Sequence, residues 1–343
     1  MMKVFSKVCP KYHKKKGEGK KRIIILILVA LVVSGFAFEK YREFEDSKKF
    51  EPPGKLIDIN GHSMHIYGEG LADNTPTVVF TSGWKTPSPY VDYYPLQKEI
   101  SKYTRAVVYE RPGYGWSEVA SGERDIDIIT KELHDLLVKA GEKGPYILVG
   151  HSFGANEVLR FAQLYSSEVA GVALIDGSNP YYTITIKRPS KYFIRYGTVK
   201  STIFNNIINM LNKFGITRLL FDNTDLYASR FTGYKNDLSL APEELRELDE
   251  AMFIKTLNNK NHLQELRMDS SRLVENKNIG NTPLKVITSS LYNSSELTRN
   301  IQQGLLKWST NSKQIIVDDS QHYVHWFKPE VISQEIIEMI KKN

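Results

Sequence analysis

A chain of 343 residues with 41% hydrophobic and 11% aromatic residues has a globular composition, which excludes disordered and fibrous proteins. The net charge of +7 is unevenly distributed. Residues 1–22 contain nine Lys/Arg and one acidic residue, Glu18, a charge of +8, so the remaining residues carry −1. The folded part therefore lacks the basic footprint of a nucleic-acid-binding protein, and we expect no nucleic-acid partner. The only cysteine, Cys9, lies in this basic tail, which excludes a disulfide, a thiol nucleophile or a thiolate metal site in the domain.

The basic tail precedes an uncharged run over residues 23–38. As a helix this run would be ~24 Å long at about 1.5 Å per residue, somewhat less than the ~30 Å hydrocarbon core of a bilayer. The lysine-rich flank favours an uncleaved transmembrane signal anchor whose tail, residues 1–22, stays in the cytoplasm. The alternative is a signal peptide cleaved at Gly35-Phe36-Ala37, which would give a secreted protein. Both interpretations place the rest outside the cytoplasm, and residues 39–54 are expected to form an exposed linker.

Strand and helix patterns then alternate. Asn60-Gly61 between two strand-like runs, 55–59 and 63–67, predicts a hairpin. Alternation predicts an α/β fold with a mostly parallel eight-stranded sheet and helices on both faces. The further strands are expected at 77–81, 105–109, 146–149, 171–175, 284–287 and 314–317, and the helices at 94–103, 125–140, 155–165, 298–308 and from Pro329 onward.

Residues 179–281 interrupt the alternation, because they lack strand signals and contain helical patterns at 203–214 and 242–257. An insertion of this length is too long for a loop between two strands, so we expect a helical cap. The core then comprises residues 55–178 and 282–343.

The most informative stretch runs from Tyr146 to Gly154. Four residues of a buried strand lead into Gly150-His151-Ser152-Phe153-Gly154, and a helical pattern follows. G-x-S-x-G between a strand and a helix is typical of a nucleophile elbow, a sharp turn that exposes the serine hydroxyl. The turn needs small neighbours two residues on either side of Ser152, which Gly150 and Gly154 provide. The other interpretation is a glycine-rich turn whose serine caps the helix.

A serine nucleophile needs a base, a group that orients the base, and donors for the oxyanion. His322, five residues beyond the last strand, is the preferred base, and His325 is the competitor. The orienting acid is less obvious, because the loop after the seventh strand has no carboxylate before Glu296. Asp176, at the end of the sixth strand and next to the elbow strand, is preferred, with Glu296 as the alternative acid. No sensible metal-ligand spacing accompanies His322 and His325, so no metal site is expected.

The oxyanion donors are expected to be backbone N–H groups. One is that of Phe153, next to the nucleophile, and the other is that of Trp84, in the loop Ser82-Gly83-Trp84 after the third strand. Glu110 and Arg111 are expected to hydrogen-bond neighbouring loops.

The chain resembles the α/β-hydrolases, in particular the capped serine hydrolases that include esterases, proline iminopeptidases and cofactor-free haloperoxidases. The resemblance covers about residues 55–343 and implies a nucleophile at Ser152, a base at His322 and oxyanion donors at Trp84 and Phe153. The matching segments are Ile57–His62, Ser82–Trp84, Tyr109–Ser117, Gly144–Gly154 and His322–Val331.

The chain departs from the common pattern of this family in two places. Ser82-Gly83 replaces a frequent His-Gly, which is tolerable because the donor is a backbone group. The position after the seventh strand has no acid; dehalogenases and some lipases of the superfamily carry it after the sixth strand, which supports Asp176. Dehalogenases and epoxide hydrolases have Asp where this chain has Ser152, which argues against both chemistries.

Together these features predict a serine hydrolase that cleaves a carboxylic ester of a small-molecule acyl substrate, with no cofactor or metal. Aminopeptidase, thioesterase and lactonase activities are alternatives within this class, and a non-catalytic ligand-binding or sensing protein is the alternative outside it. Substrate identity would depend on the cap and on five aromatic residues, Trp84, Tyr90, Tyr93, Tyr181 and Tyr182.

Overall fold

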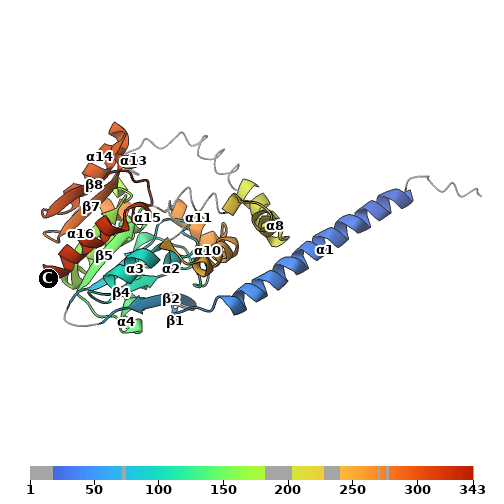
Figure 1. Ribbon diagram of the computed structural model, residues 1–343, viewed down its shortest axis with the longest axis horizontal. Coiled ribbons are helices and arrows are strands. Elements are labelled where there is room, and N and C mark those ends of the chain that lie inside the picture. The colour runs from blue at the N-terminus through green and yellow to red at the C-terminus, as the bar shows by residue number, and fades with distance from the viewer. Residues whose placement is uncertain are drawn as a thin grey trace, which may run out of the picture.

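A computed structural model describes residues 18–71, 75–181, 203–227, 240–268, 271–275 and 278–342. Its centre is an eight-stranded sheet in the order β1-β2-β4-β3-β5-β6-β7-β8 (Figure 1). The strands are β1 (Lys55–Ile59), β2 (His62–Glu69), β3 (Thr77–Thr81), β4 (Ala106–Tyr109), β5 (Tyr146–His151), β6 (Val169–Ile175), β7 (Leu284–Ser289) and β8 (Ser312–Val317). β2 pairs antiparallel with β1 and β4, and the remaining neighbours are parallel. This confirms the predicted α/β fold and mostly parallel sheet.

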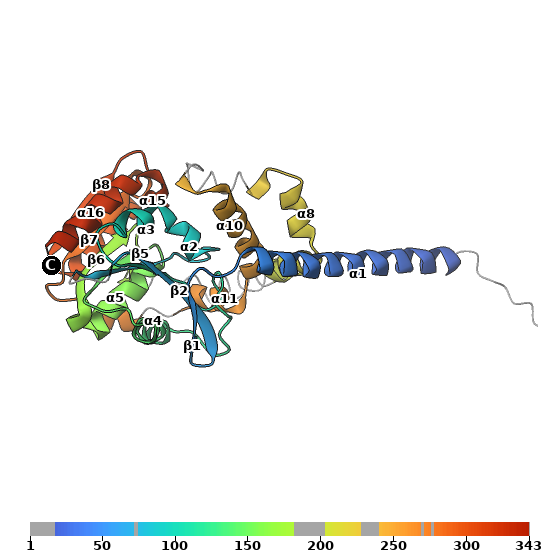
Figure 2. The ribbon, with the colours of Figure 1, turned by 60° about the horizontal axis from the view of Figure 1, so that its bottom comes forward.

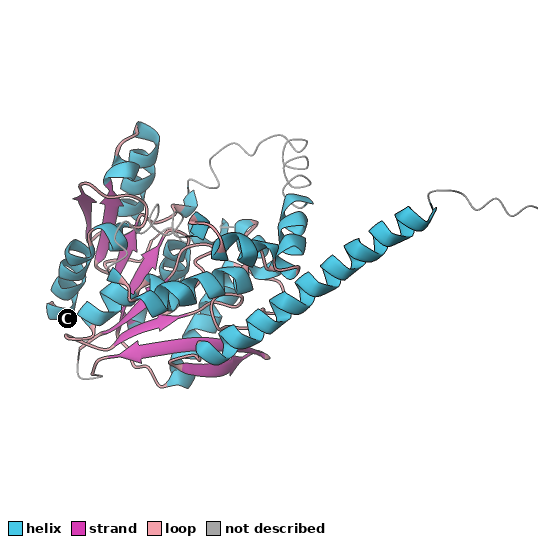
Figure 3. Cartoon of the chain, turned by 45° about the vertical axis from the view of Figure 1, so that its right-hand side comes forward, coloured by secondary structure: helices cyan, strands magenta, loops and turns pink. Residues whose placement is uncertain are grey.

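Helices cover both faces of the sheet (Figure 3). α4 (Ile126–Ala140) and α5 (Gly154–Leu164) bury their apolar residues against one face, and α3 (Tyr94–Ile100) and α16 (Pro329–Lys341) against the other. Successive strand residues point to opposite faces, so both cores are filled from the same strands. The other core helices are α2 (Pro89–Asp92), α13 (Ser290–Asn293), α14 (Glu296–Leu305) and α15 (Val324–Phe327), with short 3₁₀ turns at Ser166–Glu168 and Leu306–Trp308.

Local sequence explains the ends of α4. The Asp125 carboxylate accepts a hydrogen bond from the Ile128 N–H at 2.8 Å and caps the first turn. Gly141 ends the helix with a left-handed φ of 82°, as the sequence predicts.

The N-terminal apolar segment is one continuous helix, α1 (Glu18–Lys49), which extends away from the sheet (Figure 2). It is long and apolar enough to cross a membrane, although a signal sequence has the same properties. The expectation of a linker over 39–54 is wrong for its first part, because the helix continues to Lys49. Polar residues that favour helices, paired as in Lys40–Glu43, sustain it until shortly before Pro52.

The described parts of residues 179–281 contain helices and no strand, as expected for a cap. They are residues 203–213, α8 (Ile216–Asp222), α10 (Glu243–Thr256), α11 (Lys260–Leu266) and α12 (Ser271–Glu275). α8 and α10 lie near the C-terminal half of α1 (Figure 2). The domain boundaries stay predictions, and the basic tail before Glu18 lies outside the described residues.

Candidate active site

Ser152 occupies the sharp turn between β5 and α5. Its φ is 50°, a left-handed conformation that is unusual for a residue with a side chain. The Ser152 N–H donates to Ile175 O at 3.1 Å, and the Ser178 N–H donates to Ser152 O at 2.9 Å, so residues at and beyond the end of β6 hold the turn in place.

The two glycines of the motif are sterically required. A Cβ on Gly150 would lie 2.8 Å from the carbonyl carbon of Gly154. A Cβ on Gly154 would lie 2.3 Å from Thr81 O. Neither neighbour can yield, because both atoms belong to the backbone, so the turn exists only with glycine at these positions.

Asp176 and His322 lie in contact beside this turn. The Nδ1 atom of His322 is 3.4 Å from Oδ2 of Asp176. Asp176 is buried, whereas the side chain of His322 is 27% exposed. A buried carboxylate beside one ring nitrogen leaves the other ring nitrogen available to a substrate or a nucleophile.

The His322 loop is tied to the residue that precedes Ser152. The Nε2 atom of His151 lies 2.9 Å from His322 O, and the two imidazole rings are 4.7 Å apart between centroids. Tyr292 stacks on the His322 ring at 5.0 Å. These contacts fix the orientation of His322 relative to the turn.

The structure separates the competing candidates. Glu296 begins α14 and is exposed, so it is a first-turn helix residue, whereas Asp176 contacts His322. His325 is fully buried, and its Nε2 lies 3.3 Å from Oδ2 of Asp92. It also stacks on Tyr93, with centroids 5.2 Å apart, which makes it a packed histidine.

Ser289 is a site residue that sequence reasoning missed. It ends β7, the strand whose following loop lacks a carboxylate, and donates to Asp176 through its N–H at 2.8 Å and through its hydroxyl at 2.5 Å. A serine without a recognisable motif gives no signal that it serves an acid on another strand.

The loop Ser82-Gly83-Trp84 lies against the elbow. A Cβ on Gly83 would be 3.3 Å from Cβ of Ser152 and 3.0 Å from Nδ1 of His151. Gly83 therefore allows an approach that a side chain would obstruct. The Trp84 indole is anchored on the cap, because its Nε1 donates to His262 O at 2.8 Å.

Arg111 orients the peptides of this loop. Its guanidinium donates to Ser82 O at 2.9 Å and to Gly83 O at 3.0 Å. In a planar trans peptide the C=O and the following N–H point in opposite directions. The Trp84 N–H therefore points away from Arg111. This confirms that Arg111 hydrogen-bonds a neighbouring loop.

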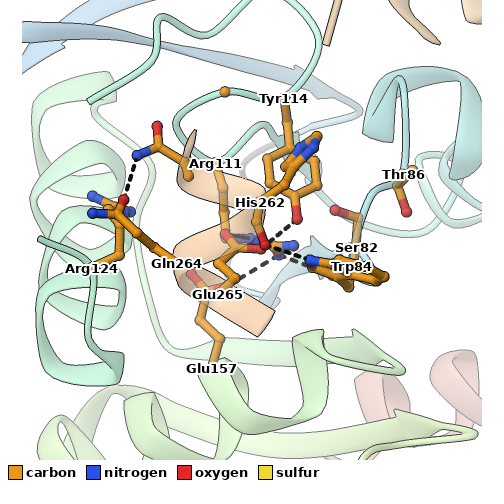
Figure 4. A network of polar contacts seen from close by, with 12 residues as sticks. Ser82, Trp84, Thr86, Arg111, Tyr114, Arg124, Glu157, His262, Gln264 and Glu265 are labelled. Atoms are coloured by element: carbon orange, nitrogen blue, oxygen red, sulfur yellow. Dashed lines mark hydrogen bonds and ion pairs between the residues drawn. The ribbon is translucent and has the colours of Figure 1, made fainter. Parts of the chain in front are cut away.

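Arg111 is held in turn by the cap. Its Nε donates to Oε1 of Glu265, on α11, at 3.0 Å, and the Tyr114 hydroxyl donates to the other Glu265 oxygen (Figure 4). Glu157 lies on the opposite side, 3.4 Å from the guanidinium, and accepts from the Tyr109 hydroxyl. Arg111 and both carboxylates are buried, so the cap and the loop beside Ser152 share one ion-pair network.

Burial changes the titration of several groups around the site. It raises the pKa of Glu157 to about 7, although Arg111 acts in the opposite direction. Burial, together with the charges of Lys85 and Arg111, lowers the pKa of His262 to about 3. Burial and the neighbouring histidines lower the pKa of His151, so this residue is neutral beside Ser152.

Asp92, His151 and His325 form the group best suited to hold a metal among the described residues. Their potential ligand atoms all lie within 4.8 Å of one another, and the three side chains are buried. One of the His151 nitrogens already faces His322 O, and His325 already contacts Asp92.

The proposed specificity aromatics differ in their surroundings. Tyr93 is buried and donates to Thr81 O at 2.9 Å, which makes it a core residue. Tyr90 is partly buried between Tyr67 and Trp116. Tyr181 is exposed, and Tyr182 lies outside the described residues.

Comparisons with known proteins agree with this architecture. The sequence profile of the alpha/beta hydrolase fold matches residues 76–329, so the chain belongs to the α/β-hydrolase family. "Uncharacterized protein YbdG" of Bacillus subtilis (strain 168) is 32% identical over 170 residues, which is 48% of this chain and 52% of that protein. The chain thus spans about half the length of this curated relative.

Solved structures of other hydrolases share the fold. The enol-lactonase of Burkholderia xenovorans LB400 superposes with a TM-score of 0.57 at 17% identity, over 84% of this chain and 100% of that chain. A thermophilic esterase from Thermogutta terrifontis superposes with a TM-score of 0.55 at 17% identity, over 84% of this chain and 96% of that chain. At this identity the likeness establishes the fold.

Proposed function

We propose that the protein is a serine hydrolase that cleaves a carboxylic ester through an acyl-enzyme, with Ser152, His322 and Asp176 as its catalytic residues. The observation that carries the proposal is the strained Ser152 turn beside a histidine whose Nδ1 faces a buried carboxylate. A serine in a relaxed cap would need neither the strain nor the adjacent pair.

In the first half of the reaction, Ser152 Oγ attacks the carbonyl carbon of the ester while Nε2 of His322 takes its proton. Asp176 accepts from the Nδ1–H and stabilises the imidazolium. The N–H groups of Trp84 and Phe153 stabilise the oxyanion, supported by the positive end of α5. Collapse of the tetrahedral intermediate breaks the ester C–O bond, and His322 returns the proton to the leaving alcohol.

In the second half, a water molecule attacks the acyl carbon and His322 takes one of its protons. Collapse of this intermediate breaks the bond to Ser152, which regains its proton from His322, and the carboxylic acid leaves. No residue is consumed in the cycle.

Covalent labelling by a fluorophosphonate probe tests the proposal. The wild-type protein should be labelled, and Ser152→Ala should abolish labelling while Ser101→Ala, at the end of α3, retains it. Undiminished labelling of a folded Ser152→Ala protein would exclude Ser152 as the nucleophile. A wild-type protein that is not labelled and hydrolyses no ester in a panel of varied acyl length would favour a ligand-binding role.

We also propose that α1 is a membrane anchor that places the catalytic domain outside the cytoplasm. The basic residues before the apolar run and the length of α1 support this topology. Protease added to intact cells stripped of any wall should digest the chain beyond residue 39. Complete protection until lysis would show the opposite orientation, and release of the domain into the medium would show a cleaved signal.

A further inference from the structure

Two neighbouring helices of the cap expose an apolar surface. It is formed by side chains of residues 203–213 and α8 that are 47% to 63% exposed. On the first helix, Ile203, Ile207 and Met210 recur at helical spacing and share one face. We call this set the cap apolar surface: Ile203, Phe204, Ile207, Met210, Leu219 and Leu220.

The turn that joins these two helices packs on α1 where the uncharged run of α1 ends, and α8 follows directly after this turn. A Cβ on Gly35 would lie 2.6 Å from Phe214 O, so the backbone of the cap touches α1 at this glycine. A Cβ on Gly215 would lie 2.8 Å from the Phe38 ring. Glycine on each side permits this close approach.

Ion pairs fix the contact one turn further along α1. Arg218 donates to both Glu39 oxygens, at 3.2 and 3.0 Å, and lies 2.9 Å from Asp46. Arg42 pairs with Asp222 at 2.9 Å. Apolar contacts at Gly35 and Phe38, followed by charged contacts from Glu39 onward, are the order expected where a helix leaves the hydrocarbon core for the headgroup region.

The two helices that carry the cap apolar surface are therefore joined to α1 at the level of the bilayer surface whenever α1 crosses a membrane. Exposed apolar clusters of this kind are costly in water, and amphipathic helices at this depth bury such residues at the headgroup boundary. Resting on the anchor proposed above, we propose that the cap apolar surface docks on the phospholipid bilayer that α1 spans. The active-site domain would then have two attachments to the membrane, the span and the cap.

Fluorescent probes at single cysteines test this docking. Cys9 is the only cysteine, so Cys9→Ser gives a cysteine-free chain. We would place a polarity-sensitive fluorophore at Ile207→Cys or Leu220→Cys and reconstitute the full chain in phosphatidylcholine vesicles with or without brominated acyl chains. Val138→Cys, on α4 and 59% exposed, is the matched control, and Val29→Cys reports whether α1 is in the bilayer. Fluorophosphonate labelling checks that each variant is folded.

The expected result is a blue-shifted emission at positions 207 and 220, quenched by brominated lipid several-fold more strongly than at 138. Aqueous emission at 207 and 220 with strong quenching at 29 would overturn the docking and leave the anchor intact. Aqueous emission at positions 207, 220 and 29 would overturn both the docking and the anchor. Blue-shifted emission at 220 without lipid quenching would assign the surface to a protein partner, such as a second copy of the chain, and would also overturn the proposal.

Discussion

Ser289 donates two hydrogen bonds to Asp176, one to each carboxylate oxygen, at 2.8 and 2.5 Å. These bonds hold the carboxylate in the position from which it reaches Nδ1 of His322. Replacing Asp176 with Asn should remove the negative charge and favour the wrong histidine tautomer. By analogy with serine proteases, kcat should fall by up to ~10⁴, or about 5 kcal/mol of barrier. Steady-state kinetics on a chromogenic ester measures this loss.

Glu296→Gln is the matched control for Asp176→Asn, because Glu296 was the alternative acid and is exposed at the start of α14. It should leave kcat near the wild-type value. A collapse of kcat in Glu296→Gln with an intact Asp176→Asn enzyme would reverse the assignment. If neither change lowers kcat, the triad is not the mechanism.

Ser289→Ala should lower kcat about tenfold, because a less restrained carboxylate orients His322 less well; tenfold corresponds to about 1.4 kcal/mol. Ser294→Ala is the comparison, since Ser294 donates to Leu291 O on the surface and touches neither catalytic group. Unchanged kcat in Ser289→Ala would mean that the Ser289 N–H alone fixes Asp176.

Arg111 should act on catalysis through the peptides that it orients. Glu265→Gln removes the charge opposite Arg111, and Arg111→Lys cannot donate to both carbonyls in the same geometry. One oxyanion donor contributes on the order of 10²–10³ in kcat. We therefore expect each of these two substitutions to lower kcat by about 10² and to change KM little. The affinity for a boronic acid analogue of the transition state should fall in parallel.

A buried ion pair elsewhere in the fold serves as the control that distinguishes a loss of kcat caused by a misplaced loop from one caused by lower stability. Arg124 and Glu132 pair at 2.6 Å with both side chains buried. Glu132→Gln should lower the melting temperature without the selective loss of kcat. Equal effects of Glu132→Gln and Glu265→Gln on kcat would show that Arg111 is merely structural.

Glu157 should make stability depend on pH. Its pKa in the folded protein is raised to about 7 from the ordinary value of 4.5, so the folded state favours the protonated form. This preference contributes free energy of unfolding that is fully present below pH 4.5 and is lost as the pH rises through about 7; the loss is on the order of 3 kcal/mol. Glu157→Gln should abolish this loss, which thermal unfolding between pH 5 and pH 8 measures. The exposed Glu99→Gln should behave like the wild type, and an unaltered pH profile in Glu157→Gln would contradict the prediction.

Arg218 should control the attachment of the cap to α1. Arg218→Ala leaves Glu39 buried without its partner, so residues 203–222 should exchange amide hydrogens faster. Arg42→Ala, which breaks a more exposed pair with Asp222, should have a smaller effect. Equal exchange in both variants would mean that the glycine contacts alone hold the cap.

The sequence predicts the elements around Ser152 well, because they depend on local rules. The strand, the sharp turn with glycine on both sides and the following helix occupy consecutive residues. Asp176 could be preferred because β5 and β6 were expected to be neighbours, and they do pair in parallel. The contact with His322 needs more, because β7 lies between β6 and β8 and the loop after β8 must return to the elbow, where His322 O meets His151.

The partners that act across long separations could not be predicted. Arg111 and Glu265 are 154 residues apart, and no spacing rule links a turn after β4 to a cap helix. The helical continuation to Lys49 was missed for a different reason. A charged, polar segment is compatible with a linker or with an exposed helix, and the contacts of Arg218 with Glu39 and Asp46 decide between them.

If α1 is the membrane anchor proposed above, its unbroken course fixes the height of the catalytic domain above the bilayer. The 11 residues from Glu39 to Lys49 add ~16 Å of rigid helix beyond the uncharged run. A flexible tether would let the domain sweep a volume of solvent around its anchor. A stiff helix braced by the cap would instead hold Ser152 in a layer parallel to the bilayer, and encounters with substrate would become a two-dimensional search. Esters that collect in or near the lipid would then meet the nucleophile far more often than esters dispersed in bulk water.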